Sequence, residues 1–398
     1  MIDDNDHDQD HDHGWCYMDL WIYRNNDLLI ASEAPKLPFN VVISKQAVVF
    51  IGPILTIVPN NYLKKTLTYL FFLCCLSFVA CEKEEKPIEP YDRGDVVSNS
   101  VSLGTDYAKQ IWFDLNTNSI VKQNDKTAWD LAFTCIDSVH YITLNSSKFM
   151  KAYNSLQNDF NAITDTINAR WQYDSDTGKL DSTAINQWWQ SDDVYIIDRG
   201  FDEEGNVLGF QKIKFELVNN NTYTIRYADL DDSNEHNVQI DKNTSYNFKY
   251  FSFDTHNEVD IAPKKDEYDL VFTQYTEIFY APHPAIPHNF TPPFSYLVTG
   301  TLINPNKVKI ALSAEENFSE IVIMDSLSYD FDMSANAIGW DWKVYDFTNG
   351  SGGLYNIVPN KNFIIRDTDG FYYKFRFVGF YDTDTGEKGT PSFEFQKL

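Results

Sequence analysis

Basic side chains are scarce in this 398-residue chain, which has 32 Lys and Arg against 58 Asp and Glu and a formal net charge of −26 at pH 7. Such an excess of negative charge repels phosphate backbones and anionic lipid headgroups. We therefore expect no nucleic-acid partner.

Cysteine is also scarce. Of the five cysteines, only Cys135 lies beyond residue 81, so a chain shortened to that point could form no intrachain disulfide. Stability must then come from a large apolar core, for which the chain has abundant Phe, Tyr and Trp.

Motifs of catalysis are missing from the sequence. It has no nucleophile elbow, no His-Glu-x-x-His, no phosphate-binding glycine loop and no cysteine pair suited to zinc. Two acidic turns, at residues 174–181 and 382–387, have carboxylates at calcium-loop spacing, but neither supplies a complete ligand set. We expect a binding protein rather than an enzyme, with no resident metal ion.

Apolar runs long enough to span a membrane are missing. One shorter run, at residues 67–79, follows Lys64-Lys65 and precedes Ala80-Cys81. Basic residues, a short apolar stretch and a small residue before the cleavage point are the parts of a bacterial secretory signal. The run is shorter than the ~20 residues that a membrane-spanning helix needs. The cysteine after it predicts a lipoprotein signal peptide over residues 61–80, with Cys81 lipidated as the mature N-terminus.

Residues 1–60 precede this signal, although a signal peptide normally starts near its basic residues. We interpret them as an upstream extension from a mis-assigned translation start. The alternative is that the His/Asp tract at residues 7–13 binds metal. Residues 81–97 are charged and contain proline, which predicts a flexible tether.

The last sixty residues have the clearest β pattern. Side chains alternate through residues 371–381, with Phe or Tyr at every second position from Phe371 to Phe377. Turn sequences at residues 367–370 and 382–386 separate this strand from β-rich segments at 362–366 and 392–396. The sequence therefore predicts an antiparallel meander at the carboxyl end.

A strand-turn-strand unit occurs twice. Trp112 and Trp129 are 17 residues apart, as are Phe251 and Tyr268, and Trp-Asp-Leu-Ala-Phe-Thr at 129–134 matches Tyr-Asp-Leu-Val-Phe-Thr at 268–273. We interpret this as an internal duplication that gives two related lobes or sheets.

Two helices are expected between the copies. Apolar residues recur at intervals of four and three from Phe149 to Ile167, which is typical of one face of an α-helix. A second, shorter helix is expected over residues 181–190. The overall prediction is an all-β fold, mainly antiparallel, with one or two inserted helices.

The C-terminal half resembles the HmuY family, which are haem-binding surface lipoproteins of Bacteroidetes. The resemblance rests on residues 338–343 (IGWDWK), 363–367 (FIIRD), 373–377 (YKFRF) and 386–389 (GEKG). It is best over residues 296–398 and extends more weakly back to about Val101. It implies a HmuY-like C-terminal region over 250–398, joined to an N-terminal β region over 98–249.

The resemblance also implies two iron-ligand segments with His or Met. One lies shortly before residues 318–320 and the other follows Trp342-Lys343, yet residues 307–315 and 344–355 contain neither residue type. Four residues are the candidate substitutes: His283, His288, Tyr345 and Met333. The structural alternatives are exposed loop histidines, a packed strand tyrosine and a methionine that fills the core.

We therefore expect a surface-anchored lipoprotein that captures haem or a related tetrapyrrole for uptake. The resemblance implies an outer-membrane lipid anchor on the cell surface and a TonB-dependent haem importer as partner. The acidic residues directly after Cys81 resemble the signal that exports Bacteroidetes lipoproteins to the outer face of the outer membrane. The alternative for these residues is an ordinary linker, with the protein facing the periplasm. The alternative is a module that keeps the fold but binds a glycan or a protein, because loss of iron ligands is what a changed specificity would produce.

Overall fold

The computed structural model describes residues 20–24, 27–31, 93–283, 291–315, 317–322, 329–346 and 353–398. The chain divides into two compact units, Met1–Glu89 and Pro90–Leu398. In the first unit the described residues form one antiparallel hairpin of β1 (Leu20–Arg24) and β2 (Asp27–Ala31). The second unit contains all the other described elements.

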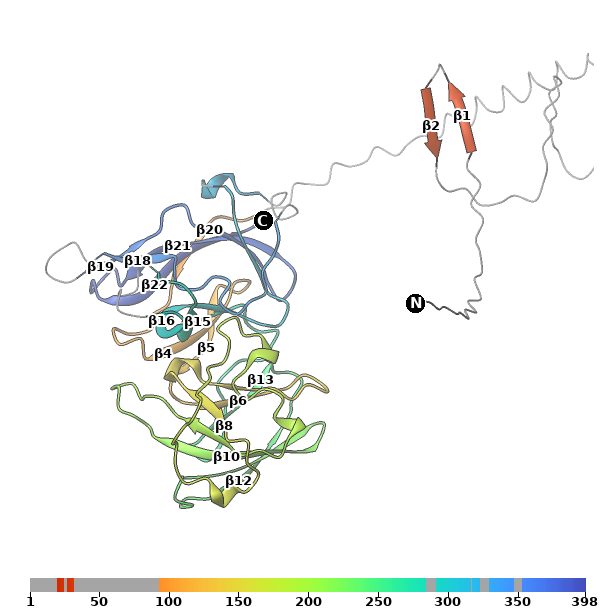
Figure 1. Ribbon diagram of the computed structural model, residues 1–398. Coiled ribbons are helices and arrows are strands. Elements are labelled where there is room, and N and C mark those ends of the chain that lie inside the picture. The colour runs from red at the N-terminus through yellow and green to blue at the C-terminus, as the bar shows by residue number, and fades with distance from the viewer. Residues whose placement is uncertain are drawn as a thin grey trace, which may run out of the picture. The chain divides into compact units, whose positions relative to one another are not determined.

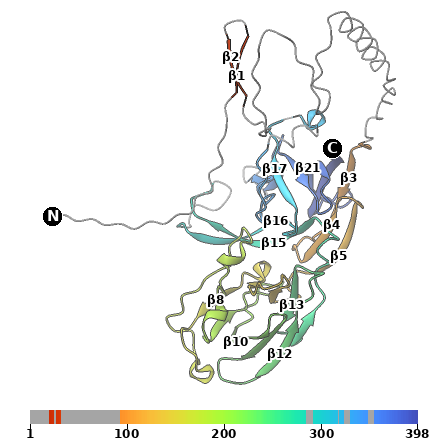
Figure 2. The ribbon, with the colours of Figure 1, turned by 90° about the vertical axis from the view of Figure 1, so that its right-hand side faces the viewer.

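The described residues of the second unit form four antiparallel sheets of four or five strands and one two-stranded hairpin (Figures 1 and 2). The carboxyl-terminal sheet has the order β17 (Lys309–Leu312), β20 (Asn362–Arg366), β21 (Tyr372–Tyr381), β22 (Lys388–Lys397) and β3 (Val97–Ser100). The bridging sheet has the order β16 (Phe294–Ile303), β15 (Leu270–Phe279), β4 (Lys109–Asp114) and β5 (Ser119–Asp125).

The other two sheets are the small sheet and the far sheet. The small sheet has the order β14 (Asn257–Val259), β13 (Phe248–Ser252), β6 (Leu131–Thr134) and β7 (Ile142–Leu144). The far sheet has the order β12 (His236–Asp241), β11 (Thr222–Ala228), β10 (Phe210–Asn219), β9 (Tyr195–Asp198) and β8 (Lys151–Asn154). A separate hairpin pairs β18 (Lys343–Asp346) with β19 (Leu354–Ile357).

The sheets lie one on another in the order carboxyl-terminal, bridging, small and far, with an apolar layer between each pair. Phe113, Phe272 and Phe393 belong to the core between the carboxyl-terminal and bridging sheets. Trp112 and Ala132 belong to the layer between the bridging and small sheets. The third layer lies between the small and far sheets. Each inner sheet therefore buries both of its faces.

The all-β prediction is confirmed, and the predicted meander at the carboxyl end is present as β20, β21 and β22. Phe363 lies opposite Phe375, and Phe375 lies opposite Phe395. These three rings are almost completely buried, because every second side chain of a strand faces the same side of its sheet.

The predicted inserted helices are wrong for the described residues, which contain only short 3₁₀ segments: η1 (Ser146–Lys148), η2 (Phe160–Ala162), η3 (Leu180–Ser182), η4 (Trp188–Gln190) and η5 (Phe318–Glu320). The stretch from 149 to 167 contains strand β8, and Leu156 and Ile167 of the supposed apolar face are 77% and 74% exposed. Residues 181–190 contain the end of η3 and the whole of η4, and no α-helix.

Side chains of Asn and Asp explain why the 149–167 stretch is not helical. Asn154 accepts a hydrogen bond from the backbone of Leu156, and Asp165 accepts one from that of Ile167. Such local bonds compete with the helical pattern. The apolar residues of this stretch then pack at separate places and not along one helix face. Phe160, for example, packs beside residues of strand β9.

The duplicated units exchange strands. The first strand of copy one, β4, pairs with the second strand of copy two, β15, and β6 of copy one pairs with β13 of copy two. The two copies therefore build the two inner sheets jointly, and neither copy forms a sheet by itself.

Each copy contains a buried aspartate where its second strand begins. Asp130 donates its backbone N–H to Phe251 O, and its carboxylate accepts from Phe253 N at 2.8 Å. Asp269 donates in the same way to Phe113 O, and its carboxylate accepts from Leu115 N at 3.0 Å. The repeated carboxylates therefore fasten each copy to the other.

A buried asparagine completes each junction. Asn145 Nδ2 donates to two carbonyl oxygens of copy one, at 2.7 Å each, and its N–H bonds the backbone oxygen of Asp130. Asn304 makes the corresponding three bonds in copy two, where its N–H bonds the backbone oxygen of Asp269. This shared bonding pattern supports the interpretation of the units as a duplication.

The Asp130 junction gives a stability prediction. Asp130 forms an ion pair of 2.5 Å with Lys148, and both side chains are completely buried. Asp130→Asn leaves a buried ammonium without its anion, so we expect the free energy of unfolding to fall by about 3–5 kcal/mol. Urea denaturation followed by tryptophan fluorescence measures this.

Asp125→Asn is the matched control, because Asp125 pairs with Lys109 at 2.6 Å with both side chains exposed. We expect a loss of at most about 1 kcal/mol there. Equal losses in the two variants would contradict the role given to the buried junction.

Candidate functional site

A cavity of about 580 Å³ lies where three strands of the second unit meet a loop. We call it the His283 cavity. Its lining comes from the end of β15 and the residues that follow, from Leu312 at the end of β17, from the start of β20, and from residues 336–341. Segments far apart in the sequence therefore meet at one place.

Strand pairing positions the first wall of this cavity. β15 pairs with β16 along its whole length, and its last residue, Phe279, lies opposite Phe294 with the rings stacked 5.1 Å apart. The chain then continues through Pro282, whose ring restricts the backbone, to His283. His283 thus lies four residues beyond a fully paired strand.

A close backbone approach positions the second wall. Gly339 exchanges two backbone hydrogen bonds with Thr301 of β16 and has a φ of +70°. A Cβ atom on Gly300 would lie only 2.5 Å from Gly339 O, so a glycine is required there. This contact fixes the loop that presents Trp340.

Three rings meet at the cavity. The His283 ring centroid lies 5.0 Å from that of Trp340 and 5.8 Å from that of Phe279, and the Phe279 and Trp340 rings are 5.7 Å apart. Phe279 is buried, whereas His283 and Trp340 are half-buried. The arrangement supplies an imidazole at the edge of an apolar aromatic wall.

Charged groups also line the His283 cavity. Lys361 Nζ lies 2.5 Å from Asp341 Oδ1. Glu277 accepts a hydrogen bond from Asn336, and burial, followed by the charge of Asp176, raises the pKa of Glu277 above its ordinary value. The cavity therefore combines apolar rings with the ammonium group of Lys361, which already pairs with Asp341.

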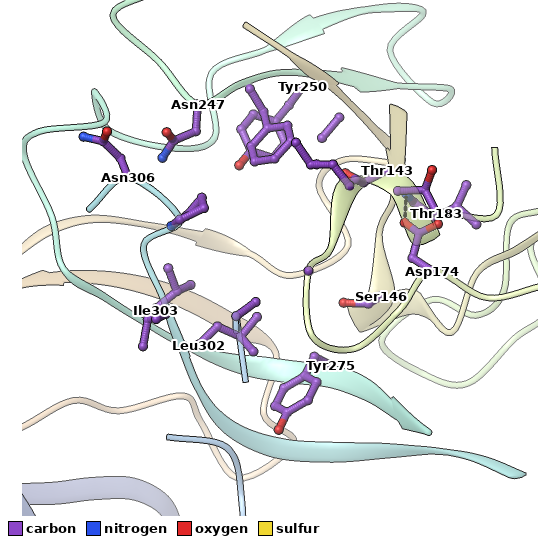
Figure 3. Close-up of a pocket in the computed structure, with 18 of the residues that line it drawn as sticks. Thr143, Ser146, Asp174, Thr183, Asn247, Tyr250, Tyr275, Leu302, Ile303 and Asn306 are labelled. Atoms are coloured by element: carbon purple, nitrogen blue, oxygen red, sulfur yellow. Dashed lines mark hydrogen bonds between the residues drawn. The ribbon is translucent and has the colours of Figure 1, made fainter. Parts of the chain in front are cut away.

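A second cavity, of about 500 Å³, lies between the bridging and small sheets (Figure 3). We call it the inter-sheet cavity. Tyr250 of β13 and Leu302 of β16 line it from the two sheets, and Asp174 and Thr183 line it from the loops that follow β8. It shares no lining residue with the His283 cavity.

Comparison with protein families gives a match to the HmuY protein family over residues 106–395, which is more than half of the chain. The chain belongs to the HmuY family. No curated protein matches the chain.

Solved structures similar to this HmuY-family protein include apo PinO from Porphyromonas gingivitis, at 10% identity and a TM-score of 0.29, with 77% of this chain and 98% of that chain covered. The apo HmuY analog TFO of Tannerella forsythia is 11% identical with a TM-score of 0.27, and the same shares of the two chains are covered.

Both segments that the family resemblance implies as ligand-bearing approach the His283 cavity. Leu312 of the first segment lines it, and so do Trp340 and Asp341, which stand just before Trp342-Lys343 and the second segment. Of the three predicted haem-binding residues that the structure describes, His283 lines this cavity and the other two do not.

Tyr345 and Met333 lie elsewhere. Tyr345 is on β18 with its ring 4.9 Å from that of Tyr355 on β19, and Tyr355 contacts Phe380 at the same centroid distance. Met333 is 50% exposed and follows Asp332, which bridges to Ile310 of β17. Neither residue lines either of the two cavities. The structure therefore does not bring His283, Tyr345 and Met333 together.

His288 and Cys81 lie outside the described residues, as do the signal peptide and most of the tether. Within the described parts of the chain, no helix is long and apolar enough to cross a membrane. The same parts contain no group of three or more His, Cys, Asp or Glu placed to hold a metal ion.

Sequence reasoning missed three residues of the cavity: Phe279, Trp340 and Lys361. Trp340 belongs to the IGWDWK segment that supports the family resemblance, so the signal for it was present. Phe279 and Lys361 have no motif around them. Their place depends on the pairing of β15 with β16 and of β20 with β17, which the sequence does not specify.

Lys343 connects the Trp340 loop to strand β16 through hydrogen bonds. Its Nζ donates to Thr299 O at 2.5 Å and to Trp340 O at 3.5 Å, and it lies 4.2 Å from the centroid of the Trp342 ring. Only 4% of the residue is exposed. Burial lowers the pKa of Lys343 to about 7.

This pKa predicts a pH dependence. An unfolded chain keeps this lysine protonated up to about pH 10, so between about pH 7 and 10 it binds a proton that the folded chain has released. The free energy of unfolding therefore rises with pH in that range. Below about pH 7 the folded chain keeps the lysine protonated and bears the full cost of burying the ammonium group. We expect Lys343→Met to be more stabilising, or less destabilising, at pH 6.5 than at pH 9.5.

Urea denaturation at the two pH values measures the difference from wild type. Lys264→Met is the control, since the Lys264 side chain is 56% exposed. A Lys343→Met effect that is the same at both pH values would contradict the lowered pKa.

Proposed function

We propose that this HmuY-family protein captures haem, or a related tetrapyrrole, in the His283 cavity and delivers it for uptake. The observation that carries the proposal is the position of His283 beside Trp340 and Phe279 at the rim of a cavity of about 580 Å³. Ligand cavities of proteins commonly have this size and an apolar lining with few polar groups.

The residues of the cavity fit the chemistry of haem. A planar apolar macrocycle needs flat apolar walls, which Trp340 and Phe279 offer, and haem iron is commonly held by an imidazole, which His283 offers. The propionate groups need a cation, and Lys361 is in the lining. Because Lys361 is paired with Asp341, a propionate would have to share or replace that carboxylate.

Support for the cellular part of the proposal comes from the sequence. The apolar run at 67–79 and the cysteine that follows it fit a lipid anchor on Cys81, and the charged tether fits display away from the membrane. We therefore propose a lipid-anchored, cell-surface protein of the outer membrane that hands its cargo to a TonB-dependent importer and catalyses no reaction.

Haemin titration tests the cargo. We expect the chain without residues 1–81 to shift the Soret band of haemin at micromolar concentration. His283→Ala removes an axial donor, so its dissociation constant should rise about tenfold or more, equal to about 1.4 kcal/mol. His256→Ala is the matched control, because His256 is exposed on the turn before β14 and outside the cavity.

Two outcomes would count against this cargo. A missing Soret shift with wild type would refute haem binding and favour the glycan- or protein-binding module. A normal shift that His283→Ala leaves unchanged would keep haem as cargo but remove His283 as its ligand.

Lipidation is tested at Cys81. Cys81→Ser removes the thiol that would carry the lipid, so we expect loss of radioactive palmitate incorporation and release of the protein from the membrane fraction. The Cys135→Ser variant, which changes a buried thiol of the folded unit, should still incorporate palmitate and stay in the membrane fraction. Equal palmitate labelling of the Cys81→Ser variant would exclude this anchor.

A further inference from the structure

The inter-sheet cavity lies where the two duplicated units face each other. Trp129 of copy one and Tyr268 of copy two line it at equivalent positions, and so do Ala132 and Val271. The cavity therefore lies at the junction of the two copies, between β4 and β15 of one sheet and β6 and β13 of the other.

A solvent-accessible space remains at this junction. About 500 Å³ lies between these two sheets, and exposed residues such as Asp137 and Lys179 form its outer lining. Part of the reason is the small side chain of Ala132 at the position where copy two has Val271. A space of this size, bounded by aromatic rings, is typical of a small-molecule site.

The rings of the cavity are arranged for stacking. Trp129 and Tyr250 pack edge to face with centroids 4.9 Å apart, which leaves ring surface of both residues in the lining. Tyr250 is half-buried although it lies between two sheets, because it faces the cavity. Figure 3 shows Tyr250 on one side of the cavity and Leu302 on another.

One polar group of the lining lacks a partner within the described parts of the chain. Thr183 is 6% exposed, and its hydroxyl makes no hydrogen bond there. Gln110 is also 6% exposed, and its oxygen accepts from Trp129 Nε1 at 3.2 Å. Buried polar groups are normally satisfied, so the Thr183 hydroxyl favours a ligand that forms a hydrogen bond with it.

The charged residues of the lining narrow the chemical class of the ligand. The inner lining carries amide, hydroxyl and aromatic groups; of its other charged side chains, Lys179 and Asp137 are exposed and Lys265 and Asp176 are half-buried. Asp174 is satisfied by the backbone N–H groups of Leu144 and Ala184. No charged group in the described lining is both buried and available to neutralise a charged ligand.

We propose that the inter-sheet cavity is a second binding site, which takes an uncharged aromatic small molecule that accepts a hydrogen bond from the Thr183 hydroxyl. The site is separate from the His283 cavity and from the proposed capture of haem. A ligand there contacts both duplicated units at once.

Nile red, an uncharged planar dye whose emission rises and shifts to the blue in apolar surroundings, is the probe. It is titrated into the full-length chain. We expect saturable binding, and we expect Tyr250→Leu, which removes a stacking ring, to raise the dissociation constant at least fivefold. Ala132→Met, which fills the cavity, should raise it at least tenfold. Circular dichroism checks that each variant is folded.

Tyr280→Leu is the matched control, because Tyr280 is 75% exposed and lines the His283 cavity instead. It should bind the dye as wild type does. Absence of saturable binding, or binding weakened by Tyr280→Leu and not by Tyr250→Leu, would overturn the proposal. If Ala132→Met does not fold, Tyr250→Leu and Tyr280→Leu still decide between the two cavities.

Discussion

Two buried aspartates hold the folded unit together. Asp130 and Asp269 are both completely buried, and each carboxylate is bound to a backbone N–H of the other duplicated copy. Burial raises the pKa of Asp269 to about 7, and the backbone hydrogen bonds from Leu115 and Thr368 oppose this rise because they stabilise the ionised carboxylate. Because each bond joins one copy to the other, the inner sheets exist only when both copies are in place.

Both cavities follow from this crossing of strands. β15 is held in the middle of the bridging sheet by β4 of the first copy, and it extends beyond that partner to Phe279. The inner part of β15 faces the inter-sheet cavity, and its end forms the wall of the His283 cavity. One strand thus connects the duplicated junction to the rim where His283 lies.

The sequence predicted the fold where local pattern and tertiary structure agree. Alternation from Phe371 to Phe377 and two turn sequences were enough for the meander, because strand period and burial coincide there. The stripe from Phe149 to Ile167 failed because local Asn and Asp bonds opposed it. For the site, His283 was identified from its proline-rich loop, but its neighbours Phe279 and Lys361 could not be, since distant pairing brings them there.

The exchange of strands also sets an order of events during synthesis of the chain. β4 and β6 lie at residues 109–134, but their partners β13 and β15 lie at residues 248–279. Such non-local pairing slows folding, because a long loop must close before the contacts form. The early strands therefore emerge with unpaired edges and apolar faces, and they stay a hazard for aggregation until more than a hundred further residues have followed.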